Sequence, residues 1–181
     1  MKSLINKIIL SLAIITTFSF NSYSQKTEKT KDGFKEYNKK GQLIKETYAD
    51  DGQKLIIDYK YDEKENKIET IYKIDNENDG KFDGLTQWNY QYDEKGNKIE
   101  KIFKKDKEND GKFDYIEQTN LKYDEKGRNI EEIIKKDYEN DERFDYLERY
   151  NYTYNEKGHK IKILHEIDKE NDGKFEEYEE Y

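Results

Sequence analysis

The chain of 181 residues contains no cysteine and no proline, and it has only two histidines. The lack of cysteine excludes disulfide bonds and a lipid-modified N-terminal cysteine. The lack of proline means that nothing interrupts a ladder of backbone hydrogen bonds in a sheet. Because cysteine is absent, histidine is scarce and no Gly-x-Ser-x-Gly motif occurs, we find no catalytic constellation and predict that the protein is not an enzyme.

Long apolar runs are also missing, except at the N-terminus. Two lysines precede an almost wholly apolar run from Ile8 to Phe20, and small serines follow it before Gln25. This pattern predicts a secretory signal peptide over residues 1–24. The run is shorter than the roughly 20 residues that span a bilayer, and an uncleaved anchor is the alternative. An exported protein without disulfides is typical of a bacterial envelope, so we expect a secreted, periplasmic or cell-envelope location and no membrane insertion after cleavage.

Charge is abundant but unbalanced. Charged residues make up 42% of the chain and hydrophobic residues only 32%, which favours disorder, whereas 17 Tyr and 8 Phe favour a folded structure with narrow apolar stripes. Loss of residues 1–24 removes two lysines and no acid, so the formal charge changes from −8 to −10 (−8 − 2). An acidic surface argues against nucleic acid and anionic membranes as partners and favours cations.

The dominant feature of the sequence is a repeat of 31 residues with two landmarks. An acidic loop begins at Asp75, Asp106, Asp137 and Asp168. A Tyr-Asp or Tyr-Asn turn followed by Glu-Lys begins at Tyr61, Tyr92, Tyr123 and Tyr154. Such an array needs no large globular core, because each unit contacts its neighbours and stability accumulates along the stack.

The two segments of each unit both predict strands. Before the turn, Trp88, Tyr90 and Tyr92 alternate with polar residues, the period-two pattern of a strand with one apolar face. After the turn, Ile99, Ile102 and Phe103 have a spacing that also fits a short helix. We favour a strand because short isolated helices are marginal and isoleucine favours sheets. The second isoleucine then faces the other side or lies at a bulge.

These signals predict an all-β fold. It is an antiparallel meander of about eleven strands, built from two-strand repeats, in a sheet that is open and twisted or curled. All acidic loops then lie along one edge and all Tyr-Asp turns along the other. The predicted divisions are a signal peptide (1–24), a flexible leader (25–31), an N-terminal hairpin cap (32–52) and four repeats (53–181).

The acidic loops carry the candidate metal ligands. Carboxylates at positions 1, 3 and 5, a glycine at position 6 and an acid at position 9 are how a loop wraps oxygen ligands around one hard cation. The candidates are Asp75, Glu77, Asp79 and Asp83; Asp106, Glu108, Asp110, Asp114 and Glu117; Asp137, Glu139, Asp141 and Asp145; and Asp168, Glu170, Asp172, Glu176 and Glu179. Glu142 replaces the glycine in the third unit, and Glu148 stands at its position 12.

Over nine to twelve residues per unit, these loops resemble the calcium loops of EF-hand proteins and the Asp-x-Asp-x-Asp-Gly loops of secreted repeat proteins. The resemblance implies Ca²⁺ as a cofactor that stiffens the array. The alternative is a plain solvated turn, because Asn-Asp-Gly sequences form good hairpin turns without metal.

The Tyr-Asp motif Tyr92-Asp93-Glu94-Lys95-Gly96-Asn97 resembles the YD repeats of RHS-type bacterial surface and toxin-shell proteins. This resemblance implies a secreted β-repeat scaffold. Gly96 is expected to have a positive φ, whereas Glu65 at the same position of the first unit predicts a different or strained turn.

Two further groups of residues have alternative interpretations. The aromatic residues that recur at one position in successive repeats, here called columns, are interpreted as packing, with stacking on sugars as the alternative. His165 is interpreted as a packing variant of its column.

The leading functional hypothesis is a non-enzymatic, exported β-repeat protein for structure or binding, with calcium in its loops. The alternatives are an adhesion or recognition module for an envelope protein or glycan, and an immunity-type partner of a secreted toxin.

Overall fold

The computed structural model describes residues 26–139, 141, 143–175 and 177–180, so the predicted signal peptide lies outside the described residues. Within them the chain forms one antiparallel sheet whose strand order follows the sequence. The twelve strands are β1 (Lys26–Thr30), β2 (Gly33–Tyr37), β3 (Leu43–Asp50), β4 (Gln53–Tyr61), β5 (Lys67–Asp75), β6 (Gly84–Tyr92), β7 (Lys98–Asp106), β8 (Tyr115–Tyr123), β9 (Asn129–Asp137), β10 (Tyr146–Tyr154), β11 (Lys160–Asp168) and β12 (Glu177–Glu180). No helix in the described residues could cross a membrane.

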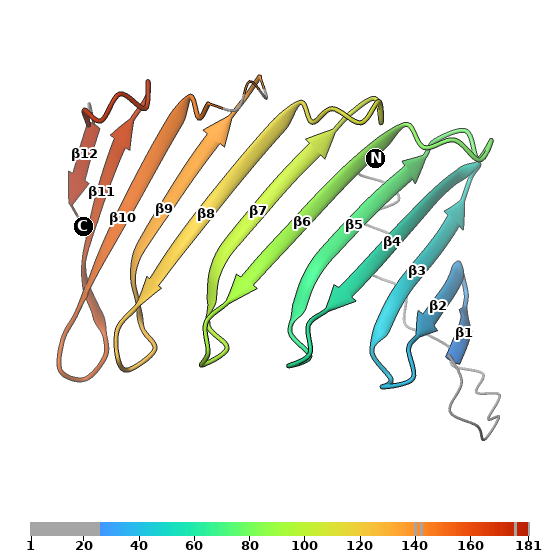
Figure 1. Cartoon of the computed structure of the whole chain (residues 1–181), viewed down its shortest axis with the longest axis horizontal. Coiled ribbons are helices and arrows are strands. Elements are labelled where there is room, and N and C mark those ends of the chain that lie inside the picture. The colour runs from blue at the N-terminus through green and yellow to red at the C-terminus, as the bar shows by residue number, and fades with distance from the viewer. Residues whose placement is uncertain (1–25, 140, 142, 176, 181) are drawn as a thin grey trace.

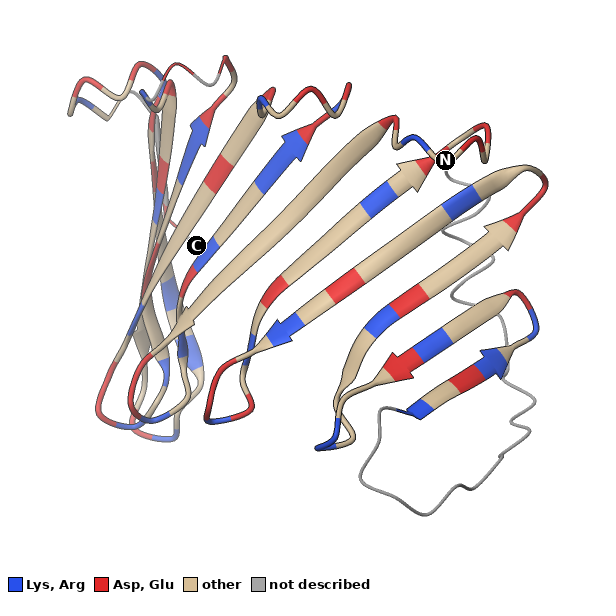
Figure 2. Cartoon of the chain, turned by 45° about the vertical axis from the view of Figure 1, so that its right-hand side comes forward, with Lys and Arg blue, Asp and Glu red and all other residues tan. Residues whose placement is uncertain are grey.

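The predicted all-β meander is confirmed. The strands stand side by side in an open row, with the acidic loops along one edge and the Tyr-Asp turns along the other (Figure 1). After a turn of the view by 45°, one end of the sheet is seen nearly edge-on while the other still shows its face, so the sheet is strongly twisted (Figure 2). The twist follows from the right-handed twist of each strand.

One boundary differs from the prediction. Residues 26–30, predicted as part of a flexible leader, form the edge strand β1, which raises the strand count among the described residues to twelve. All five of its residues pair with β2, and the Tyr37 hydroxyl donates a hydrogen bond to Glu28 at 3.0 Å. A polar sequence can form this strand because the edge of β2 offers it unpaired backbone groups.

The segments after the Tyr-Asp turns are strands, so the helical alternative was wrong. In each unit the register shifts at the last residue of the preceding strand, as between Lys60 and Tyr61. The bulge resets the pleat directly after the turn. Beyond it, Thr70 pairs with Tyr59 while Ile71 pairs with Asp58, so Ile71 and its equivalents point to the opposite face.

The two faces of the sheet differ in chemistry. We call the face that carries Leu55, Ile57 and Tyr59 of β4 the tyrosine face, because it collects the tyrosine columns of β4, β6, β8 and β10. The small core lies on it: Tyr48, Leu55 and Ile57 are buried, and partly buried side chains such as Tyr72 pack against them.

The opposite face carries polar ladders beside the apolar side chains of Ile71 and its equivalents. On it, Glu69 accepts hydrogen bonds from Gln87 at 2.9 Å and from Asn89 at 3.3 Å. One repeat later, Glu100 accepts a 2.6 Å bond from Gln118. Since all described residues belong to one sheet and its connections, neither face is covered by a second layer from the described part of the chain.

Candidate functional site

Each acidic loop is built around its first aspartate. Asp75 is only 1% exposed, and its two carboxylate oxygens accept hydrogen bonds from the backbone N–H groups of Asp79 at 3.1 Å and Gly80 at 3.0 Å. The same pair of bonds recurs at Asp106 and Asp168. A buried carboxylate is stable here because charge-assisted bonds to N–H groups replace its hydration.

The carboxylates at positions 5 and 9 also accept hydrogen bonds from backbone N–H groups. Asp79 accepts a 2.9 Å bond from the N–H of Lys81, and Asp83 accepts a 2.6 Å bond from that of Asn76. The bond at position 9 closes the loop across seven residues and recurs at Asp114 and Asp145. The glycine at position 6 takes a positive φ, 90° at Gly80 and 88° at Gly111.

The remaining candidate ligands do not join these carboxylates. Glu77, Glu108, Glu139 and Glu170 at position 3 are exposed. At position 12, Glu117 accepts a 2.9 Å bond from the Tyr115 hydroxyl on the tyrosine face, away from its loop. Glu176 and the side chain of Glu179 lie outside the described residues.

The third loop departs from the others. Asp137 is buried like its equivalents, but one of its oxygens accepts a 3.1 Å bond from the N–H of Glu139, two residues on. Asp141 binds both the backbone N–H and the guanidinium of Arg143, at 3.0 and 3.2 Å. Glu142, which replaces the glycine, lies outside the described residues.

In this structure the carboxylates of each loop face the backbone and not a common centre. A calcium ion takes six to eight oxygen ligands that converge on one point. In these loops the carboxylates aim at backbone N–H groups, and the described residues contain no group of three or more acidic, histidine or cysteine side chains arranged to hold a metal. Calcium would have to replace hydrogen bonds that already close each loop, and its binding stays a prediction.

The Tyr-Asp turns share one hydrogen-bonded design. Asp93 accepts bonds at 2.9 and 2.8 Å from the N–H groups of Lys95 and Asn97, and Gly96 has a φ of 85°. The positive φ expected at this glycine is therefore confirmed. In the first unit Glu65 adopts the same conformation with a φ of 69°, so the turn is kept at the cost of strain.

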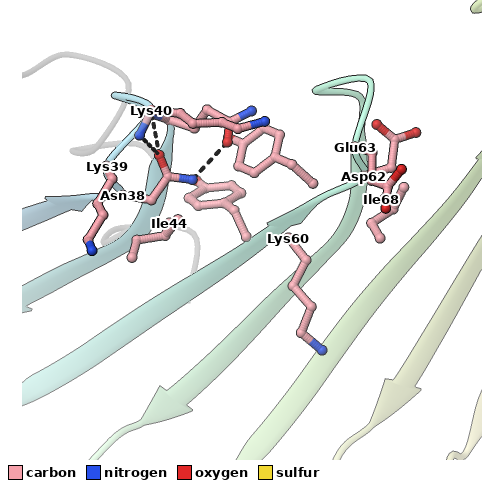
Figure 3. Close-up of a pocket in the computed structure, with 11 residues that line it drawn as sticks. Asn38, Lys39, Lys40, Ile44, Lys60, Asp62, Glu63 and Ile68 are labelled. Atoms are coloured by element: carbon pink, nitrogen blue, oxygen red, sulfur yellow. Dashed lines mark hydrogen bonds between the residues drawn. The ribbon is translucent and has the colours of Figure 1, made fainter. Parts of the chain in front are cut away.

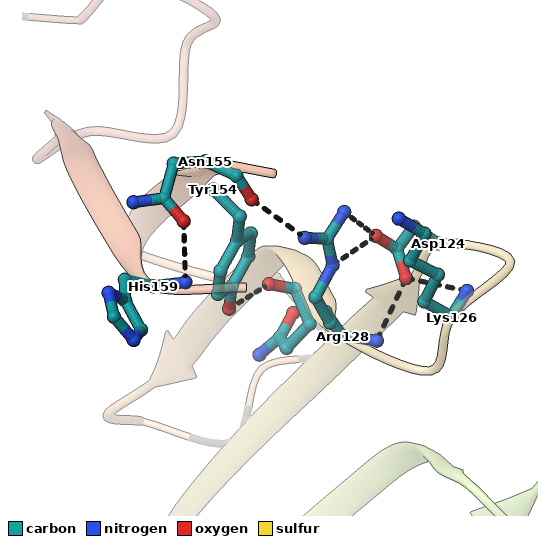
Figure 4. A network of polar contacts seen from close by, with 7 residues as sticks. Asp124, Lys126, Arg128, Tyr154, Asn155 and His159 are labelled. Carbon is teal, nitrogen blue, oxygen red and sulfur yellow. Dashed lines mark hydrogen bonds and ion pairs between the residues drawn. The ribbon is translucent and has the colours of Figure 1, made fainter. Parts of the chain in front are cut away.

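Tyrosine hydroxyls tie successive turns together. Tyr92 donates a 2.9 Å bond to the carbonyl oxygen of Lys67, and the bond recurs from Tyr123 to Lys98. Between the last two turns a network adds to it (Figure 4): Arg128 binds the Asp124 carboxylate at 2.6 Å, and its guanidinium lies 4.8 Å from the centre of the Tyr154 ring.

Grooves open between neighbouring turns on this edge. The larger, of about 840 Å³, lies between the β2–β3 and β4–β5 turns, with Asn38 and Lys40 on one side and Asp62 and Glu63 on the other (Figure 3). A smaller one of about 330 Å³ lies between the β6–β7 and β8–β9 turns. Both are open and charged at the rim, and they gather no set of groups suited to catalysis.

The tyrosine face has a strongly hydrogen-bonded carboxylate near each end. Burial by itself would raise the pKa of Glu46, but bonds from the Tyr48 and Tyr59 hydroxyls and from Lys35 lower it below its usual value. Tyr59 is partly buried, and this burial, followed by its hydrogen bond to Glu46, raises its pKa. Glu148 repeats this pattern near the other end, with a pKa lowered in spite of burial.

The middle of the tyrosine face carries a second kind of group. The rings of Trp88 and Phe103 lie 4.4 Å apart between centroids. The Lys101 ammonium lies 4.5 Å from the centre of the Trp88 ring, and that of Lys98 lies 4.2 Å from the Tyr90 ring. We call Lys67, Lys98 and Lys101, with the rings of Trp88 and Tyr90, the lysine–aromatic patch.

Sequence reasoning missed this patch. The aromatic columns were visible, but the lysines are spread over the segments that follow two different turns, and only the strand register places them beside the rings. A comparison of the repeats could have found it, because the position that Lys101 occupies in its unit is occupied by Thr70, Glu132 and Ile163 in the other units. His165, on the same face, stacks on the Tyr150 ring at 4.2 Å, which agrees with a packing role.

Comparison with known proteins gives no further lead on this arrangement. No protein-family model matches the chain. A comparison with curated proteins also found no similar protein.

Proposed function

We propose that the chain is a non-enzymatic, exported β-repeat protein and that its tyrosine face binds carbohydrate at the cell envelope. The observation that carries the proposal is the single-layer sheet: the described residues supply no second layer over a face lined with tyrosine, tryptophan and isoleucine. Large aromatic surfaces left open on a folded domain mark binding sites.

The chemistry of the face favours sugar over an apolar partner. Its rings alternate with lysine and glutamate side chains, so it offers flat apolar surfaces and hydrogen-bonding groups side by side. A sugar ring has the same two properties, with C–H groups on its faces and hydroxyls at its rim. Partly buried aromatic side chains with a polar end are suited to such mixed surfaces.

The test uses the only tryptophan of the chain, Trp88, as the reporter. Purified protein is titrated with neutral and acidic oligosaccharides while its tryptophan fluorescence is recorded, and a glycan array extends the search. We expect saturable quenching or a spectral shift with at least one glycan class. The loss of array binding in Tyr90→Ala, with unchanged circular dichroism, assigns the binding to this face. If no glycan changes the fluorescence or binds on the array, the proposal is wrong.

Calcium stabilisation of the acidic loops is a second proposal. It is supported by the regular placement of the loops, which lie in a row along one edge of the sheet (Figure 1), and by the contact between the last two, where Asn171 donates a 3.0 Å bond to the carbonyl oxygen of Phe144. A rise in melting midpoint with millimolar Ca²⁺, relative to chelator and to Mg²⁺, supports it. No rise leaves the loops as plain turns.

A further inference from the structure

We propose that the lysine–aromatic patch is a binding site for a short acidic oligosaccharide, with sugar carboxylates paired to Lys67, Lys98 and Lys101 and sugar rings stacked on Trp88 and Tyr90. This inference rests on the carbohydrate function proposed above and names the class of glycan. Its basis is a concentration of positive charge on one part of an otherwise acidic protein, whose formal charge is −8.

The three lysines share one face and lie close together. Lys67 and Lys98 occupy the same position in successive units, two strand spacings or about 10 Å apart. Lys101 is directly opposite Tyr90 across β6 and β7. Burial, and then the positive charges of Lys101 and Lys67, lower the pKa of the Lys98 ammonium. An anion placed between these groups relieves their mutual repulsion.

No carboxylate of the described residues neutralises the patch. Lys67, Lys98 and Lys101 form no ion pair within the described part of the chain, and strands β4 to β7 place no acidic residue on the tyrosine face. On the flanking strands, Glu46 and Glu117 are engaged by tyrosine hydroxyls. The positive charge is therefore available to a ligand.

The lysines lie over the rings of the patch and its neighbour Tyr59. Lys98 and Lys101 rest on Tyr90 and Trp88, and Lys67 lies 5.3 Å from the centre of the Tyr59 ring. A lysine stem has several rotatable bonds and a compact ammonium, so it can swing from a ring to a nearby carboxylate. That movement uncovers the ring for a sugar and pairs the charge at the same time.

The small size of the patch favours an oligosaccharide over nucleic acid. Nucleic-acid affinity depends on many phosphate contacts along a basic groove. Here the positive stretch ends at β8, because Glu117, Glu132 and Glu148 occupy the same face of β8 to β10. A long polyanion would lie across these carboxylates, whereas a short acidic glycan meets only the lysines.

The test is a Trp88 fluorescence titration of the full chain with hexagalacturonate, beside neutral maltohexaose and a single-stranded DNA oligonucleotide. We expect hexagalacturonate to bind at least tenfold more tightly than maltohexaose, with weaker binding at high salt. Lys98→Ala combined with Lys101→Ala should weaken hexagalacturonate at least tenfold. Lys104→Ala is the matched control, because Lys104 is on the same strand, on the opposite face, over the Phe113 ring.

Each other outcome has a definite meaning. Equal binding of both hexasaccharides, unaffected by the double variant, overturns the acidic-glycan site but leaves the carbohydrate function standing. Binding of DNA alone overturns this inference in favour of nucleic acid. If Glu132→Lys, which extends the positive charge to β9, tightens hexagalacturonate binding further, the charge argument is supported by a gain as well as a loss.

Discussion

The two halves of the tyrosine face, β3 to β7 and β8 to β11, have the same backbone but different side chains. In both, the loop aspartate is buried, the Tyr-Asp turn has a glycine or glutamate at positive φ, and a tyrosine hydroxyl reaches back to the previous unit. The first half holds the buried cluster, the lysine–aromatic patch and one carboxylate that binds tyrosine hydroxyls, Glu46. Among its described residues, the second half holds three such carboxylates, Glu117, Glu132 and Glu148, and Glu148 binds Tyr150 at 2.8 Å.

This difference separates the residues that set the fold from those that set the surface. Aspartate, tyrosine and glycine at the two landmarks satisfy backbone groups, and a change there alters the chain path. The positions between the landmarks only have to keep the period-two alternation of a strand. They can exchange lysine, glutamate, threonine and isoleucine at one position, as Lys101 and Glu132 do, and so change the charge of a face without changing the sheet.

The largest expected effect comes from the buried cluster. Leu55 is 3% exposed, whereas Leu121 on β8 is only half-buried on the same face. We expect Leu55→Ala to lower the free energy of unfolding by about 2–4 kcal/mol, because it removes buried methyl groups and leaves a cavity. Leu121→Ala should cost clearly less. Urea denaturation of both variants measures the difference, and equal losses would contradict an uneven core.

The loop anchors should behave alike in the two halves. Asp106→Ala and Asp168→Ala each leave two backbone N–H groups of a loop without their acceptor, which costs about 1–3 kcal/mol. The control is Asp110→Ala, which removes an exposed acceptor of a single N–H group. Chemical denaturation should rank the anchors together and the control well below them. A large gap between the two anchors would show that the halves differ in backbone as well as in surface.

The turn at Glu65 offers a smaller effect with the opposite sign. Its φ of 69° is strained for a residue with a side chain, and glycine relieves the strain, so Glu65→Gly should stabilise the protein by about 1 kcal/mol. The reverse change Gly158→Glu, at the equivalent position of the last turn with a φ of 83°, should destabilise it by a similar amount. Thermal melts of both variants measure these changes in stability. A destabilised Glu65→Gly would mean that the side chain, which lies 3.7 Å from Lys40, matters more than the strain.

Much of this fold could be predicted from the sequence because the same strand, turn and loop patterns recur in four units. The period, the two loop types and the alternation before the turn determined the meander and its edges. The strand at 26–30 was missed because its stability comes from the edge of β2 and not from its own residues. The lysine–aromatic patch was missed because Lys67 and Lys101 are 34 positions apart and meet only through the register of β5, β6 and β7. The acidic loops were recognised, but their carboxylates can face a metal or the backbone, and sequence spacing is the same for both.

The smallest effects concern pH, and one group from each half illustrates them. The lowered pKa of Glu46 means that its contribution to stability is present above its unfolded pKa, near 4.5, and is lost as the pH falls through the folded value. Burial, then the charge of Glu132 and a hydrogen bond to it, raise the pKa of Tyr152 to about 12. Its contribution is present below pH 10 and is lost as the pH rises toward 12.

Melting midpoints measured across this pH range test both statements. Glu46→Gln should flatten the acid side of the stability profile, and it should also change the alkaline side, because the charge of Glu46 and its hydrogen bonds help to raise the pKa of Tyr48 and Tyr59. Tyr152→Phe should flatten the alkaline side alone. Glu46 contributes to the acid side from the first half because it binds Tyr48, Tyr59 and Lys35 at once. Glu148, with its lowered pKa, contributes to the acid side from the second half. If Glu46→Gln does not flatten the acid side, the bonds from Tyr48, Tyr59 and Lys35 to this carboxylate contribute nothing measurable to the stability of the first half.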